Sequence, residues 1–171
     1  MKAVVLAIFA ATLFGVVPTL GAGATRSAQS PAKCATSEVV VWLDTNGDGA
    51  AGSTYFHLNF TNLSSRSCTL VGYPGVSAVD LSGRQLGSAA ARNPSQAVRV
   101  VSLARGASAT AVLRIAAAAN FPSSQCRRVT AAGLRVFPPN QTASKAIPFP
   151  FQACSRKGPI YLSVAAVKKA Q

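Results

Sequence analysis

The sequence has few of the residues that carry acid–base chemistry. Its 171 residues include four acidic side chains and one histidine, His57. General acid–base catalysis needs groups that exchange protons near neutral pH, usually histidine or paired carboxylates, and no acid lies within eight residues of His57. We therefore expect no catalytic residues and no enzymatic activity. The alternative is an unrecognised hydrolase, in which the fold brings His57 together with a serine and Asp80 as a catalytic triad.

Ligands for metals and nucleotides are equally scarce. Met1 is the only methionine, so a copper carrier built on methionine sulfur is not expected. No two of the four cysteines have the two-to-four-residue spacing of zinc sites. The glycines of "GDGAAGS" (residues 47–53) lack the lysine and the following helix of a phosphate-binding loop. We expect no metal site and no cofactor.

The start of the chain has the pattern of an export signal. Lys2 precedes an uncharged apolar run over residues 3–17, Pro18 ends the run, and "AGA" at residues 22–24 supplies small residues at a cleavage site. We predict a signal peptide over residues 1–24, a flexible lead-in over 25–33, one domain over 34–167 and a basic tail over 168–171. No cysteine lies directly after the cleavage site, because the first is Cys34, so we expect a secreted protein without a lipid anchor or a membrane-spanning segment.

Positive charge is in large excess. Loss of Lys2 with the signal peptide leaves 16 basic residues against 4 acidic ones, a formal charge of +12 (16 − 4). Such a charge favours anionic partners. We expect an anionic cell-wall polymer, an acidic lipid surface or another envelope protein, and not nucleic acid. The alternative is a solubilising surface without a dedicated partner.

Four cysteines in an exported chain indicate two disulfides. Cys34 and Cys68 are symmetric about position 51, and Cys126 and Cys154 are symmetric about position 140. Cysteines equidistant from a turn face each other across the open end of a hairpin. We predict the pairs Cys34–Cys68 and Cys126–Cys154, each of which should stabilise the fold by roughly 3.5 kcal/mol.

The rest of the chain has the pattern of a β-protein. Residues 55–62 ("YFHLNFTN") alternate, with Phe56, Leu58 and Phe60 on one face and His57 on the other. Pro148 and Pro150 lack ladder donors, which suits a sheet edge. The spacing of strands and turns predicts an all-β, immunoglobulin-like antiparallel sandwich of about eight or nine strands. We expect core packing for most aromatic residues, namely Tyr55, Phe56, Phe60, Tyr73, Phe137, Phe149, Phe151 and Tyr161.

Three longer stretches carry a family resemblance: "FTNLSSRSCTLVGYPGVS" (60–77), "GLRVFPPNQTAS" (133–144) and "PFQAC" (150–154). They resemble a family of secreted actinobacterial proteins catalogued as a domain of unknown function, number 4232. The resemblance extends over about residues 34–167. It implies a secreted or envelope-attached β-sandwich with the two disulfides named above, and it implies no reaction.

These observations favour a non-catalytic, secreted interaction module of the cell envelope. A structural domain without a specific ligand is the second hypothesis. The distribution of the basic residues separates the two, because a binding module should gather them on one face and a structural domain should spread them evenly.

The stretch "DTNGDGAAGSTY" (44–55) begins as a calcium-binding loop does. Such a loop needs an acidic ligand at its twelfth position, which is Tyr55, and Gly52 at its ninth position has no side chain. We interpret the stretch as a wide hairpin loop whose Asn, Asp and Gly residues adopt positive φ. A weakly held ion bound by Asp44, Asn46 and Asp48 is the alternative.

Millimolar calcium should therefore leave the melting temperature of the protein unchanged, as measured by scanning calorimetry. A midpoint that rises with calcium, and no longer rises in the Asp44→Ala variant, would show that the loop holds the ion.

Overall fold

The computed structural model describes residues 32–170. The predicted signal peptide and most of the lead-in lie outside the described residues. Lys33, which we counted with the lead-in, pairs with Thr69 in parallel fashion, and the Thr69 N–H donates to the Ala32 carbonyl. No helix in the described part of the chain is long and apolar enough to cross a membrane.

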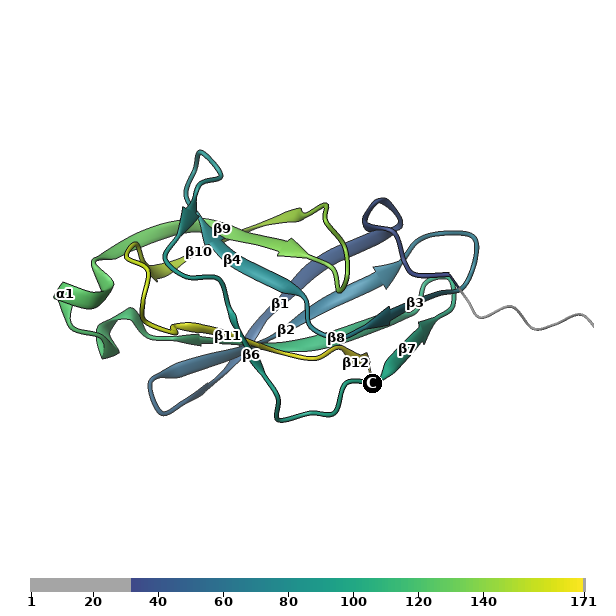
Figure 1. Cartoon of the computed structure of the whole chain (residues 1–171), viewed down its shortest axis with the longest axis horizontal. Helices are drawn as coiled ribbons and strands as arrows, with labels where there is room; N and C mark the ends of the chain where they lie inside the picture. The colour runs from purple at the N-terminus through teal and green to yellow at the C-terminus, as the bar shows by residue number, and fades with distance from the viewer. Residues whose placement is uncertain (1–31, 171) are drawn as a thin grey trace, which may run out of the picture.

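Twelve strands and three short helices form within these residues (Figure 1). The prediction of about eight or nine strands was too low because β5, β6 and β12 have only two or three residues each, too few for an alternating pattern. The strands are β1 (Val39–Ala50), β2 (Ser53–Asn62), β3 (Cys68–Val71), β4 (Gly75–Val79), β5 (Gln85–Leu86), β6 (Ala91–Asn93), β7 (Val100–Leu103), β8 (Ser108–Ala116), β9 (Arg128–Phe137), β10 (Lys145–Cys154), β11 (Leu162–Ala165) and β12 (Lys168–Lys169). The helices are η1 (Thr36–Glu38), η2 (Ala118–Asn120) and α1 (Ser123–Cys126).

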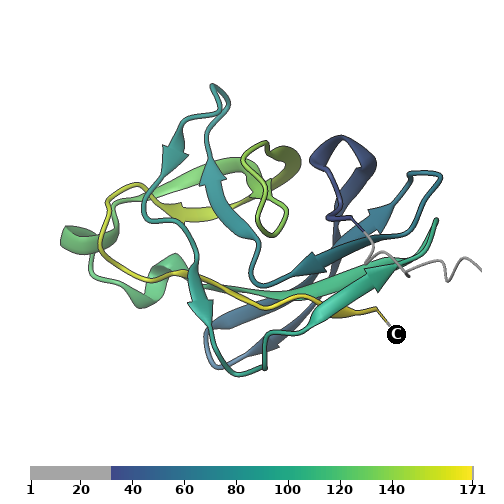
Figure 2. The same ribbon diagram turned by 45° about the vertical axis from the view of Figure 1, so that its right-hand side comes forward.

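The strands form two main sheets that lie one above the other (Figure 2). The first sheet has the order β1-β2-β8-β11-β6, with β12 also on β8, and the second has the order β10-β9-β4-β5. A two-stranded sheet of β3 and β7 extends one end. All strand pairs are antiparallel except β11–β6. The predicted all-β sandwich is confirmed.

The core lies between the two main sheets. On β2 the side chains of Phe56, Leu58 and Phe60 are buried and that of His57 is exposed, so the predicted alternation is confirmed. Strand β9 supplies Leu134 from the opposite sheet. The core therefore forms as the period-two pattern requires, with one face of each sheet turned inward.

Both predicted disulfides are present, and the described residues contain no free cysteine. Cys34–Cys68 closes the open end of the β1–β2 hairpin, where Cys34 N–H also donates to the Thr69 carbonyl. Cys126–Cys154 closes the open end of the β9–β10 hairpin, since Cys154 lies opposite Arg128 in the register. The symmetry of the cysteines about the turns was therefore a sufficient signal.

Strand β10 is an edge strand, as its prolines predicted. The β9–β10 register shifts between Pro148 and Phe151, and both prolines face solvent. The side chains of Phe149 and Phe151 are half-buried on the inner side. The edge position thus leaves two aromatic rings partly open at one side of the sandwich.

The stretch 44–55 is not the wide loop that we predicted. Strand β1 continues to Ala50, and the turn consists of Ala51 and Gly52, whose φ angles are 44° and 73°. The other Asn, Asp and Gly residues of the stretch lie within β1, where the register shifts between Asp44 and Asp48. A Cβ on Gly47 would lie 2.5 Å from the Phe56 ring. Gly47 is therefore needed for close approach of this ring rather than for positive φ.

The residues that we named the basic tail include a short strand. Lys168 and Lys169 form β12, in register with Thr110 and Ala109 of β8. The alternation of two residues was too short to reveal this pairing.

The variants Gly47→Ala and Gly49→Ala should separate close approach from turn propensity. A Cβ at Gly47 meets the buried Phe56 ring, whereas a Cβ at Gly49 has no heavy atom within 4 Å. We expect Gly47→Ala to lower the free energy of unfolding by about 1–3 kcal/mol and Gly49→Ala to change it by less than about 0.5 kcal/mol. Chemical denaturation measures both, and equal effects would contradict this role of Gly47.

Tyr161 provides a second prediction. Its side chain is 0 % exposed and its hydroxyl donates to the Leu86 carbonyl at 3.0 Å. Burial raises the pKa of this phenol to about 12. The fold therefore favours the neutral phenol, a stabilisation that is complete below the usual tyrosine pKa of about 10 and is lost as the pH rises through about 12.

An alkaline titration followed by phenolate absorbance should show Tyr161 ionising about two pH units above the usual range, or together with unfolding. The variant Tyr161→Phe should lack this late transition. Complete ionisation of all tyrosines near pH 10, with the fold intact, would contradict the burial.

Candidate functional site

A cleft of about 820 Å³ opens at the α1 end of the sandwich, between the β1–β2 turn and strand β10. Four separate parts of the chain form it: residues 49–54 with Phe56, residues 115–119, Arg128 of β9, and Phe149, Phe151 and Gln152 of β10. In Figure 1 these segments meet at the end of the molecule that carries α1. The described chain begins and ends at the other end. The volume of the cleft is within the range of about 300–1,000 Å³ that small-molecule sites occupy.

Three aromatic rings form one side of the cleft. The rings of Phe56 and Phe149 meet edge to face at 5.1 Å, and the rings of Phe149 and Phe151 lie 5.8 Å apart. Phe56 belongs to the first sheet and the other two to the second, so this contact joins the sheets at the cleft. Core packing was expected for all three rings, but Phe149 and Phe151 are only half-buried.

Small residues form the opposite wall. Residues 116–119 are four consecutive alanines, of which Ala117 and Ala119 are exposed. The Ala117 N–H and the Asn120 side-chain amide both donate to the Gly52 carbonyl at 2.8 Å. The wall is therefore tied to the β1–β2 turn by two hydrogen bonds, and the short alanine side chains leave the space empty.

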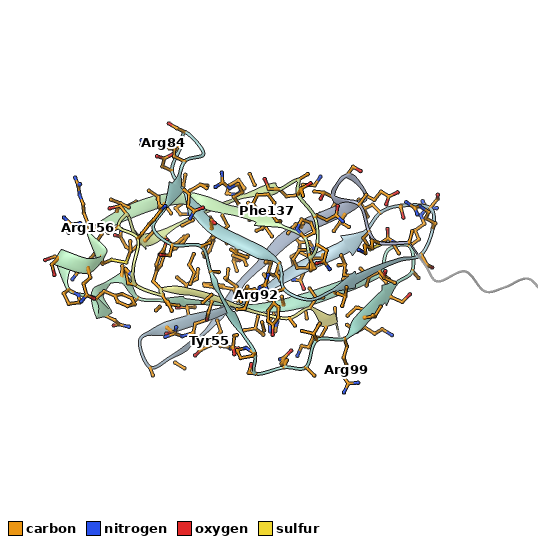
Figure 3. All side chains as sticks on the ribbon, viewed as in Figure 1. Tyr55, Arg84, Arg92, Arg99, Phe137 and Arg156 are labelled. Carbon is orange, nitrogen blue, oxygen red and sulfur yellow. A yellow bond between two sulfur atoms is a disulfide. The ribbon has the colours of Figure 1, made fainter. Side chains whose placement is uncertain are left out.

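Four cations follow the two cysteines of the Cys126–Cys154 disulfide within three residues, and we call them the basic rim: Arg127, Arg128, Arg156 and Lys157. Arg128 itself lines the cleft. The Cys126–Cys154 disulfide brings the two basic doublets together, and Arg156 N–H donates to the Cys126 carbonyl at 3.3 Å. Figure 3 shows Arg156 beside α1 at the left, whereas Arg99 lies at the lower right.

The basic rim has no acidic counterpart in the described part of the chain. Of the four acids, Glu38 pairs with Arg66 at 2.9 Å and Asp80 pairs with Arg84 at 2.8 Å. The hydrogen bond from the Arg66 side chain lowers the pKa of Glu38, and the backbone N–H of Arg84 lowers the pKa of Asp80.

The other two acids, Asp44 and Asp48, form no ion pair within residues 32–170. Asp48 lies opposite Tyr55, and Tyr55 points away from the core because its neighbour Phe56 points inward. The Asp48 side chain is therefore on the outer face of the first sheet and does not line the cleft. The positive charge of Arg128 at the cleft is therefore not compensated by an ion pair within the described residues.

His57 lies away from this site, on the outer face of the first sheet. A groove of about 600 Å³ there is lined by Trp42, His57 and Thr110 among others, and His57 Nδ1 lies 3.5 Å from Thr110 Oγ1. His57 faces Asp44 across the β1–β2 ladder without forming an ion pair. Asp80 follows β4 in the other sheet and binds Arg84. The structure thus does not bring together the residues of the hydrolase hypothesis.

The calcium hypothesis concerned Asp44, Asn46 and Asp48. Asp44 Oδ1 accepts hydrogen bonds from the backbone N–H and the side-chain amide of Asn46, both at 3.0 Å. This side chain therefore caps the local chain at the register shift of β1. Within residues 32–170 no three His, Cys, Asp or Glu residues gather where they could hold a metal ion.

The cleft and the basic rim were not predicted from the sequence. The usable signal was that the doublets Arg127-Arg128 and Arg156-Lys157 each follow a cysteine of one predicted disulfide by one or two residues. The cleft had no comparable signal, because its walls come from four segments that are separate in the sequence.

Comparison with known proteins supports the family resemblance. No curated protein matches the chain. The model of the family described as "Domain of unknown function (DUF4232)" matches residues 34–168, which is most of the chain and includes both disulfides and all residues of the cleft and basic rim. The protein therefore belongs to the DUF4232 family.

Proposed function

We propose that this protein is a secreted, non-catalytic module of the cell envelope that binds an anionic surface, either a wall polymer or an acidic lipid layer. The observation that carries the proposal is the basic rim, in which four cations without acidic partners meet at one end of the fold. The disulfide fixes the backbone that carries these cations, so binding to an anionic surface costs little further conformational entropy.

Secretion is part of the proposal. Structural disulfides form in oxidising compartments and are rare in the cytosol, and both disulfides here are fully buried. The export pattern at residues 1–24 supports the same compartment. Attachment to the cell wall would follow from binding through the basic rim.

A structural domain without a specific ligand remains the second candidate, because many cations lie elsewhere. Arg92 stacks over the Tyr73 ring at 5.6 Å, and Lys168 and Lys169 lie on β12. If the overall charge alone mattered, removal of any three cations would have the same effect on binding.

Co-sedimentation with vesicles of equal parts phosphatidylglycerol and phosphatidylcholine tests the proposal. The rim variant carries Arg127→Gln, Arg128→Gln and Lys157→Gln, and its matched control carries Arg99→Gln, Arg105→Gln and Lys169→Gln. Arg156 is retained because its guanidinium donates to the Ser124 carbonyl at 2.6 Å and supports the local fold. Each cation near an anionic membrane contributes about 1 kcal/mol, so the rim variant should bind about 100-fold more weakly at low salt.

The control should retain nearly all of its affinity, and wild-type binding should weaken as salt rises. Isolated cell wall replaces the vesicles in a parallel series. Equal losses in the two variants would favour the structural candidate, and binding that is insensitive to salt would contradict an electrostatic site.

A further inference from the structure

We propose that the cleft binds the alkyl chain of a single-chain anionic amphiphile whose head group lies against Arg128. This inference rests on the proposed function, and it specifies the chemical class of the ligand. The occupant would be one acyl or alkyl chain with a phosphate or carboxylate head.

The lining of the cleft favours an apolar occupant. Most of its lining is apolar: the rings of Phe56, Phe149 and Phe151, the side chain of Ile115 and a run of four alanines, with the polar side chains of Ser53, Thr54, Arg128 and Gln152 making up the rest. A sugar or polyphosphate chain would leave hydroxyl or charged groups without partners against the apolar part, which costs free energy. An alkyl chain has no polar group that needs a hydrogen-bond partner. Its binding is favourable because it removes the exposed apolar surface of the cleft from water.

The shape of the cleft is fixed before any ligand arrives. The Phe56–Phe149 contact holds the aromatic side, and two hydrogen bonds to the Gly52 carbonyl hold the alanine wall. A Cβ on Gly52 would lie 2.7 Å from the Asn120 side chain, so the turn and the wall are closely packed. A pre-formed cavity of this kind binds without a large ordering cost.

Charge complementarity selects an anionic head group. Among the described residues that line the cleft, Arg128 is the one with a charged side chain, and Arg127 precedes it in the chain. The exposed Gln152 lines the cleft beside Arg128, and its amide donates to Thr130 Oγ1 at 3.1 Å. A head group at the mouth would therefore meet positive charge, while the chain enters between the two sheets.

Isothermal titration below the critical micelle concentration tests the ligand class. The probes are dodecyl phosphate, decyl phosphate, dodecyl maltoside and inorganic phosphate. Each buried methylene is worth a factor of about three to four in affinity, so dodecyl phosphate should bind about tenfold more tightly than decyl phosphate. Dodecyl maltoside should bind more weakly because its head is uncharged, and inorganic phosphate should bind weakest.

Two pairs of variants test the place of binding. Ala119→Trp puts an indole into the cleft from an exposed position, and Ala97→Trp is its control on an exposed loop elsewhere. Arg128→Gln removes the cation at the mouth, and Arg99→Gln is its control at the far end of the molecule. We expect Ala119→Trp to abolish dodecyl phosphate binding and Arg128→Gln to weaken it about tenfold, with both controls unchanged.

The inference is overturned if dodecyl phosphate binds no more tightly than inorganic phosphate, or if Ala119→Trp leaves its affinity intact. It is also overturned if the free protein sediments as a dimer that Ala119→Trp converts to a monomer, because a second copy would then cover the cleft. In these cases rim-dependent vesicle binding would still support the proposed function. If the wild-type protein shows no salt-sensitive binding to vesicles, both the proposed function and this inference are overturned.

Discussion

The Cys126–Cys154 disulfide holds together the end of the molecule from which its proposed function arises. Like charges repel, so four neighbouring cations would separate if they lay on independent loops. The disulfide prevents this, because it links the segment before β9 to the last residue of β10 and places both basic doublets beside it. The same bond secures an edge strand whose two prolines donate no hydrogen bonds to the ladder.

The chemistry of the cleft follows from two contrasting sequences that meet at this end. The β8–η2 segment contributes alanines, which leave space, and β10 contributes alternating proline and phenylalanine, which face solvent and the interior respectively. Because β10 is an edge strand, its rings are covered by the first sheet on one side only. An apolar cleft with a basic mouth is the combined result.

The features that were predictable from sequence depend on local periodicity. Three patterns were of this kind: the alternation along β2, the prolines of the edge strand and the symmetric cysteines. Each can be recognised from the spacing of residues along the chain. The features that were missed depend on packing between distant segments. Gly47 was assigned to a flexible loop because its true constraint, the ring of Phe56, comes from the next strand. The cleft was missed for the same reason, since no single segment contains it.

The central claim is that an anionic amphiphile binds at the α1 end and nowhere else on the described surface. Chemical-shift mapping of the isotopically labelled protein with dodecyl phosphate tests it most directly. The account predicts saturable shifts confined to residues 49–54, 115–119, 127–128 and 149–157. Shifts centred on the outer face around Trp42 and His57, or spread evenly over all basic residues, would contradict it.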